Sequence, residues 1–95
     1  MTRLLSKEQI LAEMQEFPHW ELKKNAICKD LLFKDFGEAI QFINAVSLLA
    51  EEHNHHPDMC IRFNRVNISM TTKNPRGISQ KDFKLLKKID HFIKT

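Results

Sequence analysis

The sequence predicts an α+β domain in the order α-β-β-α-β-β-α, with a four-stranded antiparallel sheet and the helices packed on one of its faces. Two observations carry this prediction. Three segments place apolar residues three and four positions apart, and two pairs of short alternating segments each enclose a turn. Paired short strands favour an antiparallel sheet, and strands that are apolar on one side favour helices on that side alone. At 95 residues the chain has the length of one ordinary domain, so residues 1–95 are expected to form a single unit.

The first helix is predicted to begin at Ser6, because a serine hydroxyl can accept a hydrogen bond from an unpaired backbone N–H. Pro18 ends it, since the residue before a proline avoids helical geometry. Residues 20–22 alternate apolar and charged side chains and predict a short strand. A turn at residues 23–25 then leads to a second strand at residues 26–33.

A long amphipathic helix follows, capped by Asp35 and extending to about His53. Its apolar positions recur three and four residues apart: Ala39, Phe42, Ile43, Val46, Leu49 and Ala50. Ile40 and Leu48 widen the apolar arc, to which Ala50 also belongs, beyond what a single core contact requires. This width predicts self-association through residues 41–50.

The second strand pair alternates apolar and polar residues on both sides of a predicted turn at residues 64–65. This turn sets Phe63 opposite Val66, so the two apolar rows share one face and Phe63 belongs to the core. Counted outward from that pair, Lys73 falls opposite His56.

The last helix is predicted to begin at Ser79, after turn residues 74–77. Asp82 stands three residues after Ser79, a spacing that resembles a capping box. The buried stripe of this helix is formed by Phe83, Leu86, Ile89 and Ile93.

Composition and charge narrow the range of functions. Lys and Arg number 15 against 12 Asp and Glu, a net charge of +3, and the charges alternate in sign. This alternation predicts no basic stripe and no nucleic-acid partner. Cys28 and Cys60 form no CxxC, so neither a disulfide framework nor a cysteine zinc site is indicated. No apolar run has the length of a signal peptide or of a membrane span, which predicts a cytoplasmic protein without membrane contact.

The unusual local feature is the segment Glu-Glu-His-Asn-His-His-Pro at residues 51–57, where a helix gives way to a strand. Histidine titrates at about pH 6.5, so it can both give and take protons at neutral pH. Two alternatives to acid–base catalysis stay open: solvated histidines favoured by the helix dipole, or a metal site using His53 and His56 at i, i+3 spacing. No further ligand pattern completes such a site, so no metal is expected.

These residues belong to a longer pattern. In chain order it comprises Glu51, His55, His56, Pro57, Phe63, Asn64, Gly77, Ser79 and Asp82, with Trp20, residues 33–36, Ala39 and Phe42 upstream. From about residue 18 to its end, the chain resembles the pterin-4a-carbinolamine dehydratases at these positions.

The resemblance implies the same α+β fold and a hydro-lyase that converts 4a-hydroxytetrahydropterin to quinonoid dihydropterin, with no cofactor and no metal. One group must protonate the departing hydroxyl while another takes a proton from the neighbouring ring nitrogen, tasks that suit neutral histidines. By position, His55 and His56 are the catalytic pair, and Glu51, Pro57 and Asp82 are expected to bind the substrate. The resemblance further implies a homodimer or homotetramer and a link to phenylalanine hydroxylase, because aromatic amino acid hydroxylases produce this pterin.

Lys73 stands where the family usually has a third histidine. An ammonium group is a poorer acid at neutral pH than an imidazolium, so Lys73 is expected to assist by hydrogen bonding to the leaving oxygen. Structural alternatives stay open for three residues. In these alternatives Lys73 and Glu51 are solvated side chains without a role in the site, and Asp82 caps the last helix without binding the substrate.

The sequence therefore predicts a small dehydratase that recycles a pterin cofactor. Two alternatives remain. The first is a pterin-binding relative with weak catalysis, because of Lys73. The second is a protein-interaction module, since animal members of the family also serve as dimerisation partners of a transcription factor.

Overall fold

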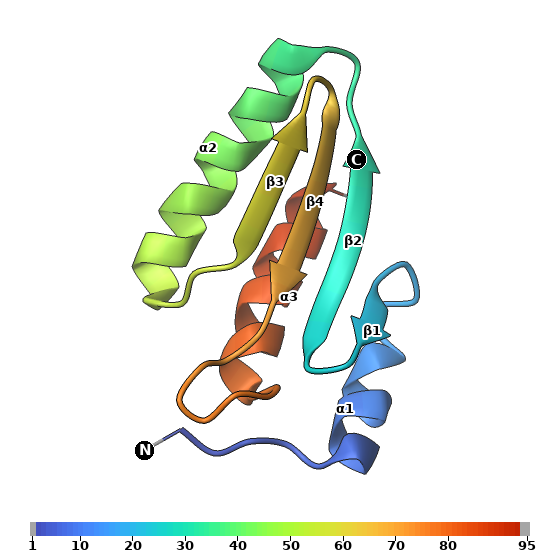
Figure 1. Ribbon diagram of the computed structural model, residues 1–95, viewed down its shortest axis with the longest axis vertical. Coiled ribbons are helices and arrows are strands. Elements are labelled where there is room, and N and C mark those ends of the chain that lie inside the picture. The colour runs from blue at the N-terminus through green and yellow to red at the C-terminus, as the bar shows by residue number, and fades with distance from the viewer. Residues whose placement is uncertain (1, 94–95) are drawn as a thin grey trace.

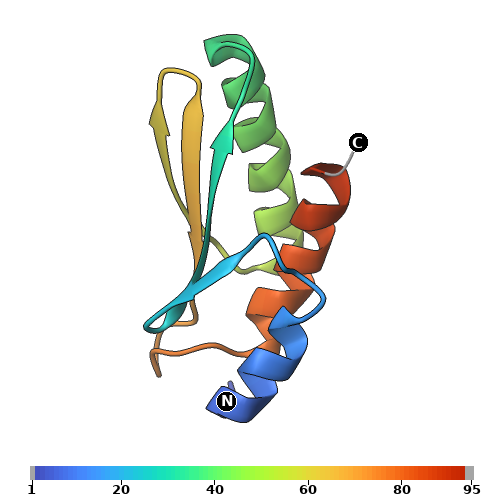
Figure 2. The same ribbon diagram turned by 90° about the vertical axis from the view of Figure 1, so that its right-hand side faces the viewer.

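The computed structural model describes residues 2–93. Its elements follow the predicted order: α1 (Lys7–Met14), β1 (Glu21–Lys23), β2 (Ala26–Leu32), α2 (Phe36–His53), β3 (Asp58–Arg62), β4 (Arg65–Met70) and α3 (Gln80–Ile93). The helices lie on one side of the sheet, as the front view (Figure 1) and the side view (Figure 2) show together. The predicted α+β architecture is therefore confirmed.

The first two helices begin at the predicted caps. The hydroxyl of Ser6 accepts the N–H of Gln9 at 3.1 Å, and the Gln9 side chain accepts the Ser6 N–H at 2.8 Å. A carboxylate oxygen of Asp35 accepts the N–H of Glu38 at 2.8 Å. None of the helices within residues 2–93 combines the length and the apolar character needed to cross a membrane.

The sheet has the strand order β1-β2-β4-β3, and every neighbouring pair is antiparallel. The core lies between its covered face and the helices. Fully buried apolar side chains come from both layers: Ile27, Val46, Val66, Ile68, Met70, Leu85, Leu86 and Ile89. Trp20 joins the start of β1 to α3, because its indole N–H donates to the carboxylate of buried Asp90 at 3.0 Å.

The pairing of β3 with β4 differs by two residues from the predicted register. Val66 lies opposite Ile61, and Phe63 and Asn64 form the turn. Asn64 fixes this register because it continues the β2–β4 ladder. The backbone N–H of Phe33 donates to the carbonyl of Asn64 at 2.8 Å, and the side-chain amide of Asn64 donates to the carbonyl of Phe33 at 3.0 Å. Phe63 is consequently 69% exposed at a φ of 53°, and its predicted place in the core is wrong.

The outer side of α3 carries a basic stripe, which the sequence pattern did not predict. Its exposed side chains include every lysine of the helix, namely Lys81, Lys84, Lys87 and Lys88. The two acids of the helix, Asp82 and Asp90, are buried on the opposite side. Charges that alternate along the chain are thus separated by the helical period, and the prediction that no basic stripe exists is wrong for α3.

Candidate active site

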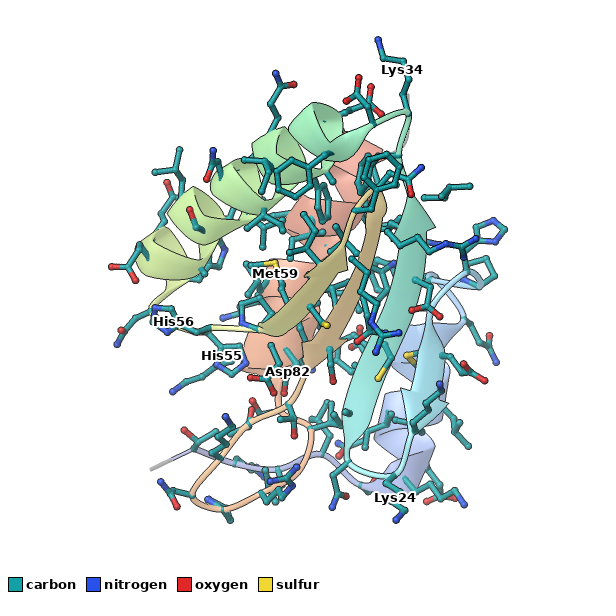
Figure 3. The ribbon with its side chains drawn as sticks, turned by 45° about the horizontal axis from the view of Figure 1, so that its top comes forward. Lys24, Lys34, His55, His56, Met59 and Asp82 are labelled. Carbon is teal, nitrogen blue, oxygen red and sulfur yellow. The ribbon has the colours of Figure 1, made fainter. Side chains whose placement is uncertain are left out.

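Two chain segments meet where β3 begins and β4 ends. The first is residues 54–57, in which Asn54 closes α2 in the left-handed conformation with a φ of 49°. The second is residues 71–79, which lead from β4 into α3. Antiparallel pairing sets the start of β3 beside the end of β4, and Figure 3 shows His55 next to Asp82 there, with His56 nearer the end of α2.

His55 is the more enclosed of the two adjacent histidines. Its side chain is 12% exposed, and its Nε2 lies 2.6 Å from Oδ1 of Asp82. Its backbone N–H donates to the carbonyl of Ala50 in the last turns of α2 at 3.1 Å. The ring is therefore held between the end of α2 and the start of α3.

Asp82 is fully buried and accepts hydrogen bonds on both carboxylate oxygens. Oδ1 faces His55, while Oδ2 accepts the hydroxyl of Thr72 at 2.7 Å and the backbone N–H of Ser79 at 2.9 Å. The Thr72 hydroxyl also lies 2.7 Å from the Ser79 hydroxyl. The carboxylate thus caps the start of α3 and holds His55 at the same time.

The sequence pattern assigned no role to Thr72, and for Ser79 it indicated a helix cap and a place in the family pattern. The Ser-x-x-Asp spacing did indicate that Ser79 and Asp82 lie close together. Nothing in the local pattern points to Thr72, because its hydroxyl reaches Asp82 only after the loop between β4 and α3 has folded back. This loop is closed by two backbone hydrogen bonds between Thr72 and Gly77, at 2.7 and 2.9 Å.

His56 lies in a more open position. Its Nε2 is 2.6 Å from Oε2 of Glu51, and the two side chains are 56% and 76% exposed. Glu51 comes from the last turn of α2, five residues earlier in the chain. An exposed pair of this kind stabilises a fold little, so its effect is mainly to orient the imidazole. Pro57, which is half-buried, follows directly and leads into β3.

Lys73 is not where the predicted register placed it. With the observed register, position 71 and not Lys73 falls opposite His56 when the ladder is extended outward. Lys73 lies in the loop after β4, with its Nζ 3.9 Å from Oδ1 of Asp58 at the start of β3. Both side chains are more than half exposed, and such pairs contribute only about 0–1 kcal/mol.

One hollow lined by polar side chains lies apart from the predicted site residues. A shallow hollow of about 540 Å³ occupies the open face of the sheet, near the β3–β4 turn, and its lining includes Asp30, Cys60, Arg62, Arg65 and Asn67. None of the predicted site residues lines it. Among residues 2–93, no three His, Cys, Asp or Glu side chains gather as metal ligands would.

Comparison with known proteins agrees with this arrangement. A family model described as pterin 4 alpha carbinolamine dehydratase matches residues 3–92. A relative from Sulfurisphaera tokodaii, provisionally named pterin-4-alpha-carbinolamine dehydratase, is 43% identical over 89 residues, which cover 94% of this chain and 96% of the relative.

Two solved structures share the fold. A protein from Brucella melitensis, described as a transcriptional coactivator/pterin dehydratase, has a TM-score of 0.88 and 26% identity, covering 94% of this chain and 97% of its own. A pterin dehydratase-like protein described as a RuBisCO assembly factor in the alpha-carboxysome has a TM-score of 0.65 over 80% of this chain and 88% of its own. At 18% identity, the second likeness concerns the fold alone.

The family match spans almost the whole chain, and the curated relative is matched over nearly its full length. The fold agrees, and the adjacent histidines stand at the junction where the sequence pattern places them. This chain therefore belongs to the pterin-4-alpha-carbinolamine dehydratase family.

Proposed function

We propose that the protein dehydrates 4a-hydroxytetrahydropterin to quinonoid dihydropterin, with His55 and His56 as the proton-transferring residues. The observation that carries the proposal is the pair of adjacent imidazoles, each with Nε2 2.6 Å from a carboxylate oxygen. A carboxylate in that position orients the ring and stabilises the imidazolium that forms when the ring takes up a proton.

The reaction needs no co-reactant. One imidazolium gives a proton to the hydroxyl on C4a, which leaves as water. The other imidazole takes the proton from the neighbouring ring nitrogen, and a carbon–nitrogen double bond forms between the two ring atoms. Protons gained and lost balance over a turnover, so solvent only has to exchange them between the two histidines.

Burial supports a division of roles among the predicted site residues. Asp82 has no exposed surface, so we assign it to positioning His55 and not to touching the pterin. Glu51 is exposed beside His56 and can orient that ring while also facing a bound substrate. Pro57, directly before β3, is assigned to contact the bound substrate.

The test is a direct assay of 4a-hydroxytetrahydropterin loss, with the uncatalysed rate measured alongside because this dehydration also proceeds without an enzyme. His55→Ala and His56→Ala should each lower the catalysed rate by about 10²–10⁴, the usual loss for a general acid or base. His91→Ala is the matched control, since His91 is exposed on α3 away from the site. Wild-type rates in both site variants would exclude the assignment.

A second candidate is a pterin-binding protein with weak turnover, and the position of Lys73 favours it. The Lys73 ammonium pairs with Asp58 in solvent and so supplies no third acid–base group of the histidine type. This candidate predicts that pterin binds with ordinary affinity while the dehydration rate stays close to the uncatalysed one. Measuring binding and turnover on the same preparation separates the two functions.

We further propose that α2 mediates self-association as a homodimer or homotetramer. Leu48 on this helix is 73% exposed, which supports the proposal, whereas Ala50 is 3% exposed and belongs to the core, not to an outer face. The same surface would serve the alternative role of an interaction module. The proposed setting is the cytoplasm, with phenylalanine hydroxylase as the enzyme that supplies the substrate.

A further inference from the structure

We infer that the hydroxyls of Thr72 and Ser79 form, with Asp82, a directed hydrogen-bond chain that keeps the proton of neutral His55 on Nε2 and leaves Nδ1 as its reacting nitrogen. The inference deepens the proposed function and rests on it for the identity of the reaction. The effect of the chain on the ring itself is independent of turnover.

The direction of the chain follows from counting protons. The Thr72 hydroxyl has one proton and lies 2.7 Å from Oδ2 of Asp82, to which it donates. The bond between the Thr72 and Ser79 hydroxyls must then use the Ser79 proton. The Ser79 oxygen in turn accepts the backbone N–H of Lys81 at 3.3 Å. Every donor therefore points toward Asp82.

The same count places the proton on His55. Oδ2 of Asp82 already accepts two hydrogen bonds, from the Thr72 hydroxyl and the Ser79 N–H. An ionised carboxylate is an acceptor only, so the hydrogen bond of 2.6 Å between Oδ1 and the ring is donated by Nε2–H. In a neutral imidazole the other nitrogen, Nδ1, then carries the lone pair.

Burial makes this arrangement rigid. Thr72, Ser79 and Asp82 are 4%, 1% and 0% exposed, so water does not replace the hydrogen bonds between them. The backbone of Thr72 is fixed by its two hydrogen bonds with Gly77. Polar groups in such an environment are costly to leave unpaired, and a chain with a single direction strengthens each of its bonds.

His56 provides the contrast. Its partner Glu51 is 76% exposed at the side chain, and no described residue donates a further hydrogen bond to that carboxylate. Nothing comparable to Thr72 or Ser79 fixes the proton of His56. The chain therefore acts on one histidine of the pair.

Ring nitrogen NMR tests the inference directly. Protein with ¹⁵N-labelled histidine should show His55 as the Nε2–H form when neutral, and the signal is assigned by its loss in His55→Gln. Thr72→Val removes one donor to Asp82 at nearly constant volume. With one of the two donors to Oδ2 removed, the carboxylate should turn away from His55 in a fraction of the molecules, and in that fraction the neutral ring can carry its proton on Nδ1. A measurable Nδ1–H signal should therefore appear, and kcat should fall at least about tenfold, the loss expected when one charge-assisted hydrogen bond is removed.

Thr72→Ser keeps the hydroxyl and should restore both the ring signal and kcat. Thr71→Val is the matched control, because Thr71 is similarly buried but its hydroxyl donates its one proton to the carbonyl of Asn25 instead of to Asp82. If Thr72→Val does not fold, Ser79→Ala decides, with a smaller shift in the same direction because Thr72 still donates. Unchanged ring signals in the folded variants, or an equal change in Thr71→Val, overturn the inference.

The ring signals are recorded without substrate, which separates this inference from the proposed function. A wild-type protein that does not accelerate dehydration refutes the function, while the NMR comparison still decides whether the chain controls His55. A fully active protein in which neutral His55 carries its proton on Nδ1 refutes the chain and leaves the function standing.

Discussion

Replacing Asp82 with asparagine keeps the size of a fully buried side chain but changes which of its atoms accept hydrogen bonds. In the wild-type protein Oδ2 accepts from Thr72 and Ser79, and Oδ1 accepts from His55. An asparagine amide has one accepting oxygen and one donating nitrogen. When its oxygen takes the place of Oδ2, the amide nitrogen faces Nε2, and neutral His55 must move its proton to Nδ1.

The expected magnitude has two parts. Three hydrogen bonds to a charged group become neutral, and each loses roughly 1 kcal/mol, since charged bonds contribute about 1.5–3 kcal/mol and neutral ones about 0.5–1.5 kcal/mol. The free energy of unfolding should fall by about 3 kcal/mol, and Tm by roughly 12–24 °C for a domain of this size. The dehydration rate should fall by up to about 10⁴, the loss known when an aspartate that orients a catalytic histidine becomes asparagine.

Thermal unfolding, the ring nitrogen spectrum and the dehydration assay measure the three effects. Asp90→Asn is the control, because Asp90 is also buried on α3 and accepts the indole N–H of Trp20, yet does not touch His55. It should lose stability and keep its rate. An Asp82→Asn protein that turns over at the wild-type rate, with His55 still protonated at Nε2, refutes the reasoning.

Lys73→Ala should change the free energy of unfolding by no more than about 0.5 kcal/mol because its ion pair is exposed. Lys73→His should dehydrate the pterin faster than Lys73→Ala, because it puts an imidazole at the position where the family usually has a third histidine. Equal rates in both variants and in the wild type would make Lys73 a bystander. Trp20→Phe should lower the free energy of unfolding by about 1–3 kcal/mol, because it removes the indole hydrogen bond to Asp90. A denaturant midpoint equal to that of the wild type would argue against this contact. Sedimentation of the wild type at micromolar concentration should show self-association that Leu48→Glu weakens, whereas a purely monomeric wild type contradicts an interface on α2.

The sequence by itself determined the features that depend on near neighbours. The caps at Ser6 and Asp35 involve residues three positions apart, so the local pattern contains both partners. Alternation along the strands determined which side faces the core, and the spacing from His55 to Asp82 identified the family. These features require no knowledge of which distant segments meet.

The register of the second hairpin was decided only by the tertiary structure. Side chains on a strand alternate with a period of two, so a shift by two residues leaves the same side chains on the covered face. The pattern therefore fits both the predicted and the observed pairing. The contacts between Phe33 and Asn64, residues distant in the chain, select the observed one. Because of this shift, position 71 and not Lys73 falls opposite His56, and Phe63 lies in the turn outside the core.

The difference between the two histidines was also decided by the tertiary structure. They are adjacent in the chain, yet His55 points to a buried carboxylate from α3 and His56 to an exposed one from α2. Thr72 joins the site only because the loop between β4 and α3 folds back onto Asp82. Burial depends on all the segments that surround a side chain. The sequence therefore does not reveal that His55, Thr72 and Asp82 share a hydrogen-bond chain shielded from water while His56 stays outside it.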